Sequence, residues 1–261
     1  MKDILQKICE NKKIELEITK QRCSFSSLEK IIKDKNNRNF KELIINSQDK
    51  KNNNIIAEIK KASPSAGVII KDYFPEIIAA DYEKSGVGAI SILTENTFFH
   101  GSLDHLSLIN KKTSLPILRK DFIIDPYQIL ESKVYQADAI LLIASILDDN
   151  QIKDFINLAE QYGLDCLVET HTEDELNRAI NIGYPIIGIN NRNLKNLSVN
   201  IHNTLNLINK IPKEFIVVAE SGIKSKKDII IYNDIGVFNF LIGESILKST
   251  NINDKIREFL N

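Results

Sequence analysis

After residue 54 the sequence repeats one pattern eight times: a short run of β-branched and other apolar residues, then an amphipathic helical stretch. The runs are rich in Ile, Val and Leu at successive positions, as expected of parallel strands that are covered by helices. This alternation indicates an α/β fold and is the strongest constraint on the architecture. The runs are IIAEI from Ile55, AISIL from Ala89, LPILR from Leu115, AILLIA from Ala139, CLVE from Cys166, PIIGI from Pro185, FIVVA from Phe215 and FLIG from Phe240.

Helix boundary signals lie between the runs. Asp125 followed by Pro126 is typical of an N-cap and a first helical residue. Four glycines come directly after helical patterns, where a left-handed C-terminal residue is needed. They are Gly86, Gly163, Gly183 and Gly236.

Eight strand–helix units in 261 residues favour a (β/α)8 TIM barrel, which typically takes about 250 residues. A doubly wound open sheet is the competing fold. It seldom needs eight evenly spaced units, and no GxGxxG motif follows the first run. We therefore predict the barrel for residues 51–261, as the catalytic domain.

Residues 1–50 lie outside the repeat and predict a helical extension that packs on the barrel. Two polar helical patterns, LQKICENKKIELEITKQ and SLEKIIKDK, occupy it, and DKKNNN forms the loop into the first strand. The segment is too short and too polar to build a core of its own, so we expect it to cap the barrel or border its active site.

The composition excludes several classes of partner. Lys plus Arg total 34 and Asp plus Glu total 35, so no charge excess favours nucleic acid. Three cysteines without a CxxC motif and four histidines without HExxH predict neither a metal site nor a disulfide framework. The N-terminus is too charged for a signal peptide, and no apolar run approaches the length of a membrane span. We expect a cytoplasmic protein without a membrane partner.

Polar residues end five of the eight runs, and a glycine ends a sixth. In a TIM barrel the C-terminal ends of the strands form the active site, so these side chains should converge on one mouth. They are Glu58 and Lys60, Lys120, Glu169, Asn190 and Arg192, Glu220 and Ser221, and Gly243.

The stretch AEIKKASPSAG, residues 57–67, places Glu58 and Lys60 two positions apart at the end of an apolar strand. Side chains two apart in a strand share a face. At the C-terminal end of a barrel strand that face opens into a pocket, so we interpret the pair as functional. The alternative is a structural salt bridge that plugs the barrel.

Two glycine turns suggest a phosphate ligand. AESGI follows the seventh run and LIGES includes the end of the eighth, and these are the loops with which barrels often bind phosphate. Neither strand ends in Lys or Arg, so we expect backbone dipoles to hold the anion. For each turn alone, an ordinary tight turn is the alternative.

Eight motifs together resemble the indole-3-glycerol-phosphate synthase family of tryptophan biosynthesis, in the family's order across residues 55–248. The resemblance implies ring closure, decarboxylation and dehydration of 1-(2-carboxyphenylamino)-1-deoxyribulose 5-phosphate to indole-3-glycerol phosphate, without cofactor or metal. The N-terminal extension also suits the family. The motifs are IIAEIKKASPSAG, SILTENTFFHGS, LPILRKDFIIDPYQI, LLIASIL, LVETHTEDEL, IIGINNRNL, VVAESGI and FLIGESIL.

The resemblance also implies catalytic roles. Lys120 in LRKDF would be the general acid that protonates the substrate ketone as the ring closes. Lys60 would contact the substrate carboxylate and donate a later proton. Glu169 would act in the dehydration, Glu58 would set the electrostatics of the lysines, and Asn190 would orient the substrate hydroxyls.

The implied substrate contacts come from further strand ends and loops. Arg192 would face the carboxylate, for which its planar fork is suited. Phe99 and Phe122 would enclose the anthranilate ring, although core packing is an alternative for both. Leu241 would contact the substrate. The phosphate would rest on Ser63, Ser221, Gly222 and Gly243.

One position departs from some relatives, which carry serine after the last glycine. Here Glu244 follows Gly243, and a carboxylate would repel a phosphate. We therefore expect Glu244 to turn outward and Ser245 or backbone amides to serve instead.

Three other functions stay open at this point. A phosphoribosyl isomerase would share the phosphate loops, but would pair a cysteine or aspartate with another aspartate. A Schiff-base aldolase would use Lys120 as nucleophile. A phospho-sugar-binding barrel would bind without turnover. In each case the partner is a small molecule, and we expect a monomer.

Overall fold

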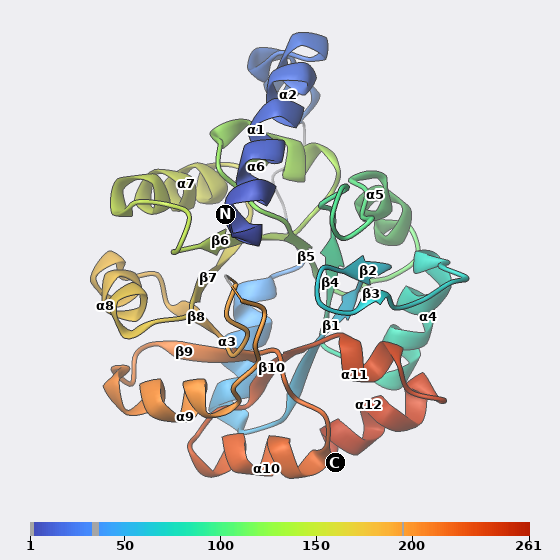
Figure 1. Ribbon diagram of the computed structural model, residues 1–261, viewed down its shortest axis with the longest axis vertical. Helices are drawn as coiled ribbons and strands as arrows, with labels where there is room; N and C mark the ends of the chain where they lie inside the picture. The colour runs from blue at the N-terminus through green and yellow to red at the C-terminus, as the bar shows by residue number, and fades with distance from the viewer. Residues whose placement is uncertain (1–2, 33–36, 195) are drawn as a thin grey trace.

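The structure is a computed structural model that describes residues 3–32, 37–194 and 196–261. Eight parallel strands form a closed ring with helices around it, which confirms the predicted (β/α)8 barrel (Figure 1). Every one of the eight apolar runs contributes a strand. They are β1 (Asn54–Ile59), β4 (Ala89–Leu93), β5 (Ile117–Lys120), β6 (Ala139–Ile143), β7 (Asp165–Thr170), β8 (Ile186–Asn190), β9 (Ile216–Glu220) and β10 (Asn239–Ile242).

Helices follow the strands and cover the outside of the ring. The predicted boundary signals hold: Asp125 accepts a hydrogen bond from the amide of Tyr127 at an N-cap, and the four C-terminal glycines have positive φ angles. The helices are α4 (Pro75–Ser85), α5 (Asp104–Asn110), α6 (Pro126–Val134), α7 (Asp149–Gln161), α8 (Glu173–Ile182), α9 (His202–Leu207), the 3₁₀ turn η1 (Ile208–Lys210), α10 (Lys226–Asp234), α11 (Glu244–Leu247) and α12 (Ile252–Leu260).

The ring closes where the first strand meets the last. β1 pairs in parallel with β10, with Asn54 opposite Asn239. The side-chain Nδ2 of Asn54 donates to Oδ1 of Asn239 over 2.9 Å, and the side-chain Nδ2 of Asn239 donates to the carbonyl of Ile44 over 3.2 Å. These buried side chains join the two ends of the sheet and connect them to the helix that precedes β1.

Three helices come before the barrel: α1 (Ile4–Arg22), α2 (Phe25–Ile31) and α3 (Phe40–Lys50). α2 packs on α6, and α1 and α2 lie at the top of the molecule in Figure 1. α3, which the sequence pattern did not single out, contacts β7, β9 and β10 and buries Phe40 and Ile44 completely. The second predicted helix, SLEKIIKDK, ends earlier than expected at Ile31, and its residues 33–35 lie outside the described part of the chain.

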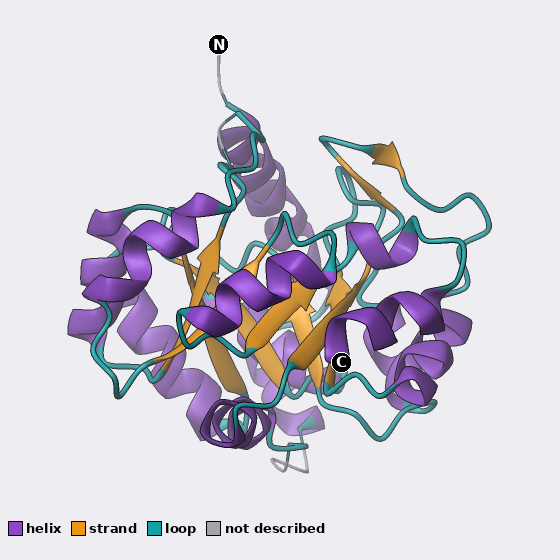
Figure 2. Cartoon of the chain, turned by 90° about the horizontal axis from the view of Figure 1, so that it is seen from below, coloured by secondary structure: helices purple, strands orange, loops and turns teal. Residues whose placement is uncertain are grey.

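The loop after β1 forms a small antiparallel hairpin, β2 (Ala62–Ser63) with β3 (Gly67–Val68), that the sequence did not predict. Figure 2 shows this hairpin at the same end of the molecule as α1. Within the described residues, no helix is long and apolar enough to span a membrane.

Candidate active site

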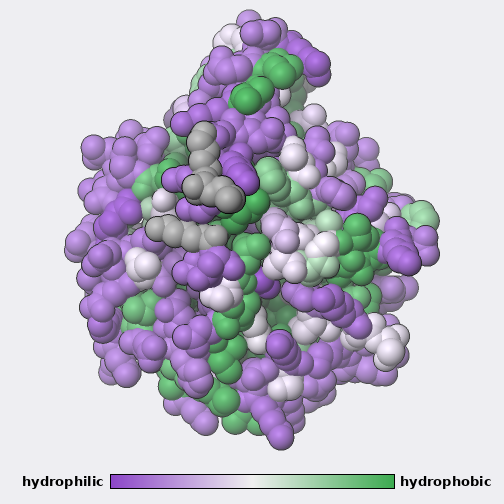
Figure 3. Space-filling model, in the orientation of Figure 1, coloured by the Kyte–Doolittle hydropathy of each residue, from purple (hydrophilic) through white to green (hydrophobic). Residues whose placement is uncertain are grey.

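The C-terminal ends of the strands surround a pocket of about 470 Å³. Figure 3 shows apolar surface along the centre of one face of the molecule, with hydrophilic residues around it. The pocket brings together twelve of the thirteen site residues predicted from the sequence, all except Ser63. They are Glu58, Lys60, Phe99, Lys120, Phe122, Glu169, Asn190, Arg192, Ser221, Gly222, Leu241 and Gly243.

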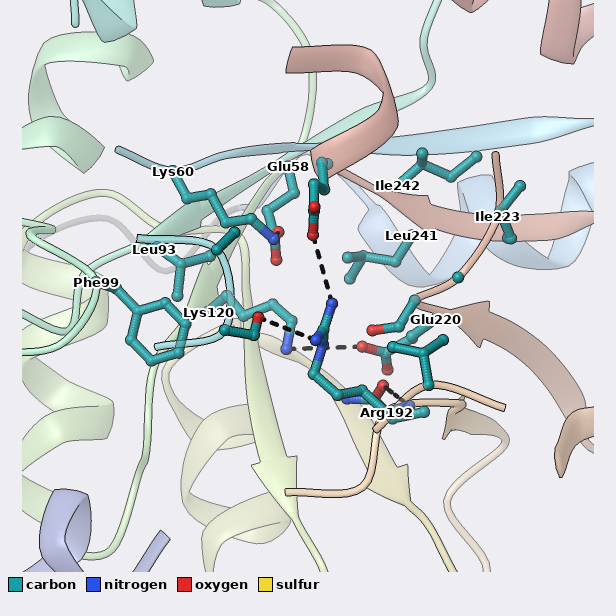
Figure 4. A pocket seen from close by; sticks show the side chains of 18 of the residues that line it. Glu58, Lys60, Leu93, Phe99, Lys120, Arg192, Glu220, Ile223, Leu241 and Ile242 are labelled. Carbon is teal, nitrogen blue, oxygen red and sulfur yellow. Dashed lines mark hydrogen bonds and ion pairs between the residues drawn. The ribbon is translucent and has the colours of Figure 1, made fainter. Parts of the chain in front are cut away.

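Glu58 and Lys60 form an ion pair on the pocket side of β1 (Figure 4). Only 6% of the Glu58 side chain and 13% of the Lys60 side chain are exposed. Gly243, at the end of β10, leaves the space that Glu58 fills, because a Cβ atom there would lie 2.5 Å from Glu58 Oε1. The glycine of the LIGES motif thus has a packing role in addition to any role in ligand binding.

Lys120 lies between two carboxylates at the end of β5. Its Nζ is 3.1 Å from Glu169 Oε2 and 3.6 Å from Glu220 Oε2. Burial by itself lowers the pKa of Lys120, but Glu169, Glu220 and Glu58 outweigh it and raise the pKa above its ordinary value. The lysine is therefore a buried ammonium at neutral pH.

Glu220 is a site residue to which the sequence assigned no role. Its carboxylate is 1% exposed, and neither oxygen has a hydrogen-bond partner among the described residues. Burial and the charge of Glu169 raise the pKa of Glu220 well above its ordinary value. Its sequence signal was its position at the end of the seventh run. In the structure, Gly188 on the neighbouring strand leaves room for it, because a Cβ atom there would lie 2.3 Å from Glu220 Oε1.

The pKa of Glu169 is shifted in the opposite direction to that of Glu220. Burial opposes its ionisation, but Lys120 and His171 outweigh burial and hold its pKa well below its ordinary value. His171 Nε2 lies 3.3 Å from Glu169 Oε1, and Nδ1 lies 3.3 Å from Glu175 Oε2. No sequence pattern indicated His171, because one of its carboxylate partners belongs to β7 and the other to α8.

Arg192 extends from the loop after β8 across the mouth. Its guanidinium donates to Ser65 Oγ over 3.0 Å and lies 3.5 Å from Glu244 Oε2. The expectation that Glu244 turns outward is wrong: Glu244 lines the pocket, where Arg192 and Lys248 pair with it. Two cations hold the carboxylate inward, and sequence alone did not show that they surround it.

The phosphate loops have an unusual backbone and more positive charge than the strand ends predicted. Ser221 and Gly222 adopt consecutive left-handed conformations, with φ angles of 64° and 85°. Lys224 and Lys248 line the same pocket, each a few residues beyond its strand end. Backbone amides are therefore not the sole source of positive potential at this side of the mouth.

Ser63 does not line the main pocket. It lies in the hairpin after β1, where its hydroxyl accepts from the amide of Ala66 over 3.2 Å. Ser65, two residues later, lines the pocket and contacts Arg192. The turn of the hairpin directs Ser65 toward the mouth, and Ser63 lines an adjoining smaller pocket together with Ser65 and Arg192.

The aromatic pair Phe99 and Phe122 lines the pocket with ring centroids 6.1 Å apart and planes at 38°. A flat ring needs about 7 Å between two parallel rings, because carbon atoms in contact are about 3.5 Å apart. The two phenylalanines therefore have to separate before they can enclose an aromatic ligand.

Comparisons with known proteins decide the family. The sequence profile of the indole-3-glycerol phosphate synthase family matches residues 5–259. The chain belongs to this family. It is 51% identical over 205 residues to indole-3-glycerol phosphate synthase of Acetivibrio thermocellus, covering 78% of this chain and 79% of the relative. It is 44% identical to that of Endomicrobium trichonymphae over 260 residues, covering 98% of each.

A solved structure supports the fold alone. 3-Hexulose-6-phosphate synthase from Salmonella typhimurium superimposes with a TM-score of 0.65 at 12% identity, covering 79% of this chain and 96% of that one. The barrel is thus shared with distant proteins, whereas the indole-3-glycerol phosphate synthase match extends over the sequence. Of the functions that the strand-end residues left open, the family favours the lyase over the isomerase, the aldolase and the binding barrel.

Proposed function

We propose that the pocket at the barrel mouth converts 1-(2-carboxyphenylamino)-1-deoxyribulose 5-phosphate to indole-3-glycerol phosphate by ring closure, decarboxylation and dehydration. The observation that carries this assignment is the family match over residues 5–259. The buried ammonium of Lys120 between two carboxylates supports it, because each step after binding moves a proton or a negative charge.

Lys120 is the general acid for ring closure. When the aromatic carbon attacks the ketone, the carbonyl oxygen becomes an alkoxide and needs a proton. Lys120 is charged, buried and directed into the pocket, so it stabilises the oxyanion as it forms and then protonates it. Loss of CO2 then restores the aromatic ring.

Dehydration needs an acid for the departing hydroxyl and a base for the carbon-bound proton. Glu169 is the base in our assignment, because its carboxylate stays ionised next to Lys120 and His171. Glu220 stays protonated and donates a hydrogen bond to the substrate, while Lys60 supplies the proton for the departing hydroxyl. Two carboxylates with opposite pKa shifts are a common arrangement for dividing such roles.

The pocket also suggests how the substrate lies. Lys60, Arg192, Phe99 and Phe122 line both the main pocket and an adjoining pocket of about 60 Å³. Two cations beside two aromatic rings suit the carboxyphenyl end of the substrate. The phosphate end then lies at the opposite side of the mouth, near the loops that follow β9 and β10.

Asn190 lies between these two ends. Its Oδ1 accepts from the amide of Arg192 over 3.0 Å, which fixes the side chain at the end of β8. Its amide NH2 group has no hydrogen-bond partner among the described residues and orients the substrate hydroxyls. Leu241 contributes an apolar contact from the pocket wall, and Ser221, Gly222 and Gly243 bind the phosphate.

We include the N-terminal extension, residues 1–50, in this proposal as a brace for the active site. Lys12 Nζ lies 3.2 Å from Asp121 Oδ1, the residue directly after Lys120. Asn11 donates to Thr97 Oγ1 over 2.8 Å, in the loop that carries Phe99. One helix thus contacts two of the loops that border the pocket.

We also propose a cytoplasmic enzyme that acts as a monomer, and its balanced net charge supports the absence of a nucleic-acid partner. Size-exclusion chromatography with light scattering tests the oligomeric state. A dimer at micromolar concentration would contradict that part of the proposal.

Product formation tests the assignment directly. Purified protein and the carboxyphenylamino-deoxyribulose phosphate are mixed with a chelator present, and indole fluorescence is followed. We expect turnover, with one CO2 released for each indole formed. Substrate binding without product would contradict the assignment and favour the binding barrel, and borohydride trapping of a covalent adduct at Lys120 would favour the aldolase.

A further inference from the structure

A line of alternating charges leads from the pocket toward the surface. It begins at Lys120 and continues through Glu169 and His171 to Glu175, with contacts of 3.1, 3.3 and 3.3 Å. The exposed fraction of the side chain rises from 1% at Glu169 to 10% at His171 and 15% at Glu175. The proposed mechanism uses only the first two members, so the part played by the histidine needs its own account.

We propose that His171 is a positioning residue that places the negative charge on Glu169 and leaves the proton on Glu220, which rests on the role proposed above for Glu169. The two carboxylates flank the same lysine and are both 1% exposed. Lys120 donates a hydrogen bond to Glu169 and lies 3.6 Å from Glu220, so it already favours the charge on Glu169, and His171 adds to that preference. His171 contacts Glu169, whereas the Glu220 oxygens have no hydrogen-bond partner among the described residues.

The backbone fixes the imidazole in this position. His171 directly follows β7, and its amide donates to Glu175 Oε2 over 2.7 Å. Its carbonyl accepts from the side chain of Asn203 over 3.0 Å. Both main-chain groups are therefore engaged, and the ring is directed between the carboxylate of the strand and that of the first turn of α8.

Geometry also indicates the charge on the ring. Each ring nitrogen lies 3.3 Å from a carboxylate oxygen: Nδ1 makes a hydrogen bond with Glu175, and Nε2 makes an ion-pair contact with Glu169. Two ionised carboxylates therefore favour an imidazolium. Burial opposes that charge, but Glu169 and Glu175 outweigh burial and raise the pKa of His171 to about 9.

Other charges act on Glu169 but do not replace the histidine. Lys120 faces it from β5 and Glu220 from β9, and Glu58 acts on Lys120 from β1. Lys120 contacts both carboxylates, and Glu58 acts through that shared lysine. Among the described charged groups, His171 makes a direct contact with Glu169 and acts on Glu220 only through space.

A catalytic consequence follows from this asymmetry. If the imidazolium is removed, part of the enzyme carries its proton on Glu169 and lacks the base. A difference of about one pKa unit between the two carboxylates corresponds to about a tenfold change in their relative protonation. We expect His171→Gln to lower kcat roughly tenfold with little change in KM.

The pH profile separates this role from a structural one. In the unsubstituted enzyme His171 loses its proton as pH rises through about 9, so kcat should fall there toward the value of the variant. In His171→Gln that step should be absent. His202→Gln, on the exposed start of α9, is the matched control and should keep both the rate and the step. A variant that keeps the step near pH 9 would overturn the proposal.

A titration that needs no turnover tests the proposal independently of the reaction. Histidines are labelled with ¹⁵N, and the ring signals are followed from pH 5 to pH 11 in the full chain. We expect His171 to stay protonated at neutral pH, and Glu169→Gln to lower its pKa more than Glu220→Gln does. An equal effect of the two substitutions, or a neutral ring at pH 7, would overturn it. If the indole assay fails while the histidine titration gives the expected result, only the proposed function is contradicted.

Discussion

At the scale of single residues, the site depends on two glutamates whose pKa values are shifted in opposite directions. Glu169 and Glu220 are equally buried and share Lys120, yet the pKa of Glu169 is lowered and the pKa of Glu220 is raised. Lys120 and His171 contact Glu169 and stabilise its charge, whereas burial and the charge of Glu169 disfavour ionisation of Glu220. A division of acid and base roles follows from these neighbours.

Removal of Lys120 should affect the chemistry far more than the fold. Lys120→Ala takes away the proton donor for ring closure, so we expect kcat to fall by about 10²–10⁴. Circular dichroism and the ability to bind product should be retained. Single-turnover kinetics at saturating substrate measures the effect. A rate close to that of the unsubstituted enzyme would show that another group protonates the ketone.

Two glycines allow the effect of a steric clash to be tested separately from the effect of a left-handed backbone conformation. Gly188→Ala should lower kcat, because the new Cβ would lie 2.3 Å from Glu220 Oε1 and displace the carboxylate. Gly236→Ala meets no atom within 4 Å but has a φ angle of 82°, so it should cost about 1–2 kcal/mol of stability at unchanged kcat. Kinetics and urea denaturation on both variants decide the matter. A lowered kcat in Gly236→Ala with an unchanged kcat in Gly188→Ala would contradict the packing role of Gly188.

The stability of the protein should fall between about pH 6.5 and pH 9. His171 has an ordinary pKa near 6.5 when unfolded and one of about 9 when folded. A raised pKa stabilises the fold fully below the unfolded value, and the contribution is lost as pH rises through the folded value. The loss amounts to roughly 3 kcal/mol at about 1.4 kcal/mol per pKa unit. Urea denaturation at pH 6 and pH 10 measures it, and His171→Gln should show a smaller difference.

Strand-end residues were predictable from the sequence, whereas loop residues were not. Glu58, Lys60 and Lys120 follow apolar runs directly, and the two-residue period of a strand fixes the face on which they lie. Glu244 was misplaced because its position depends on cations, one of them Arg192 from a distant segment. Periodicity does not encode such contacts.

At the scale of elements, the barrel strands followed from composition, and the short additions did not. A strand buried on both faces produces a continuous apolar run, which a reader of the sequence can find. The hairpin β2–β3 has two residues per strand, too few for a periodic signal. α3 shows only Phe40 and Ile44 as buried residues, so its pattern resembles a loop with occasional apolar residues.

The contact between α1 and the strand ends can be tested by one substitution. Lys12 is 7% exposed and pairs with Asp121, which also accepts the amide of Phe122 over 2.8 Å. Lys12→Met leaves a buried carboxylate with fewer partners, so we expect a loss of about 3–5 kcal/mol. Glu15→Gln, at a side chain 32% exposed, should cost about 1 kcal/mol or less. Urea denaturation of both variants gives the comparison, and equal losses would contradict the brace.

At the scale of the whole molecule, the closed ring turns eight separate strand ends into one site. Residues from Glu58 to Gly243 are brought to one mouth although 185 positions separate them in the sequence. The number of strands was readable from the repeat, and the position of the mouth followed from the architecture. The size and shape of the pocket were not readable, because they depend on loops and on the extension.

The seam between β1 and β10 sets an order of events during synthesis. The chain emerges from the ribosome at about 5–20 residues per second, N-terminus first. β1 is complete at Ile59, but its partner begins at Asn239. For the time needed to translate the intervening 180 or so residues, roughly 10–40 seconds, the edge of β1 stays without its partner strand. An unpaired edge is a template for aggregation. Nascent chains halted before residue 239 should therefore be the form of this enzyme that most needs a chaperone.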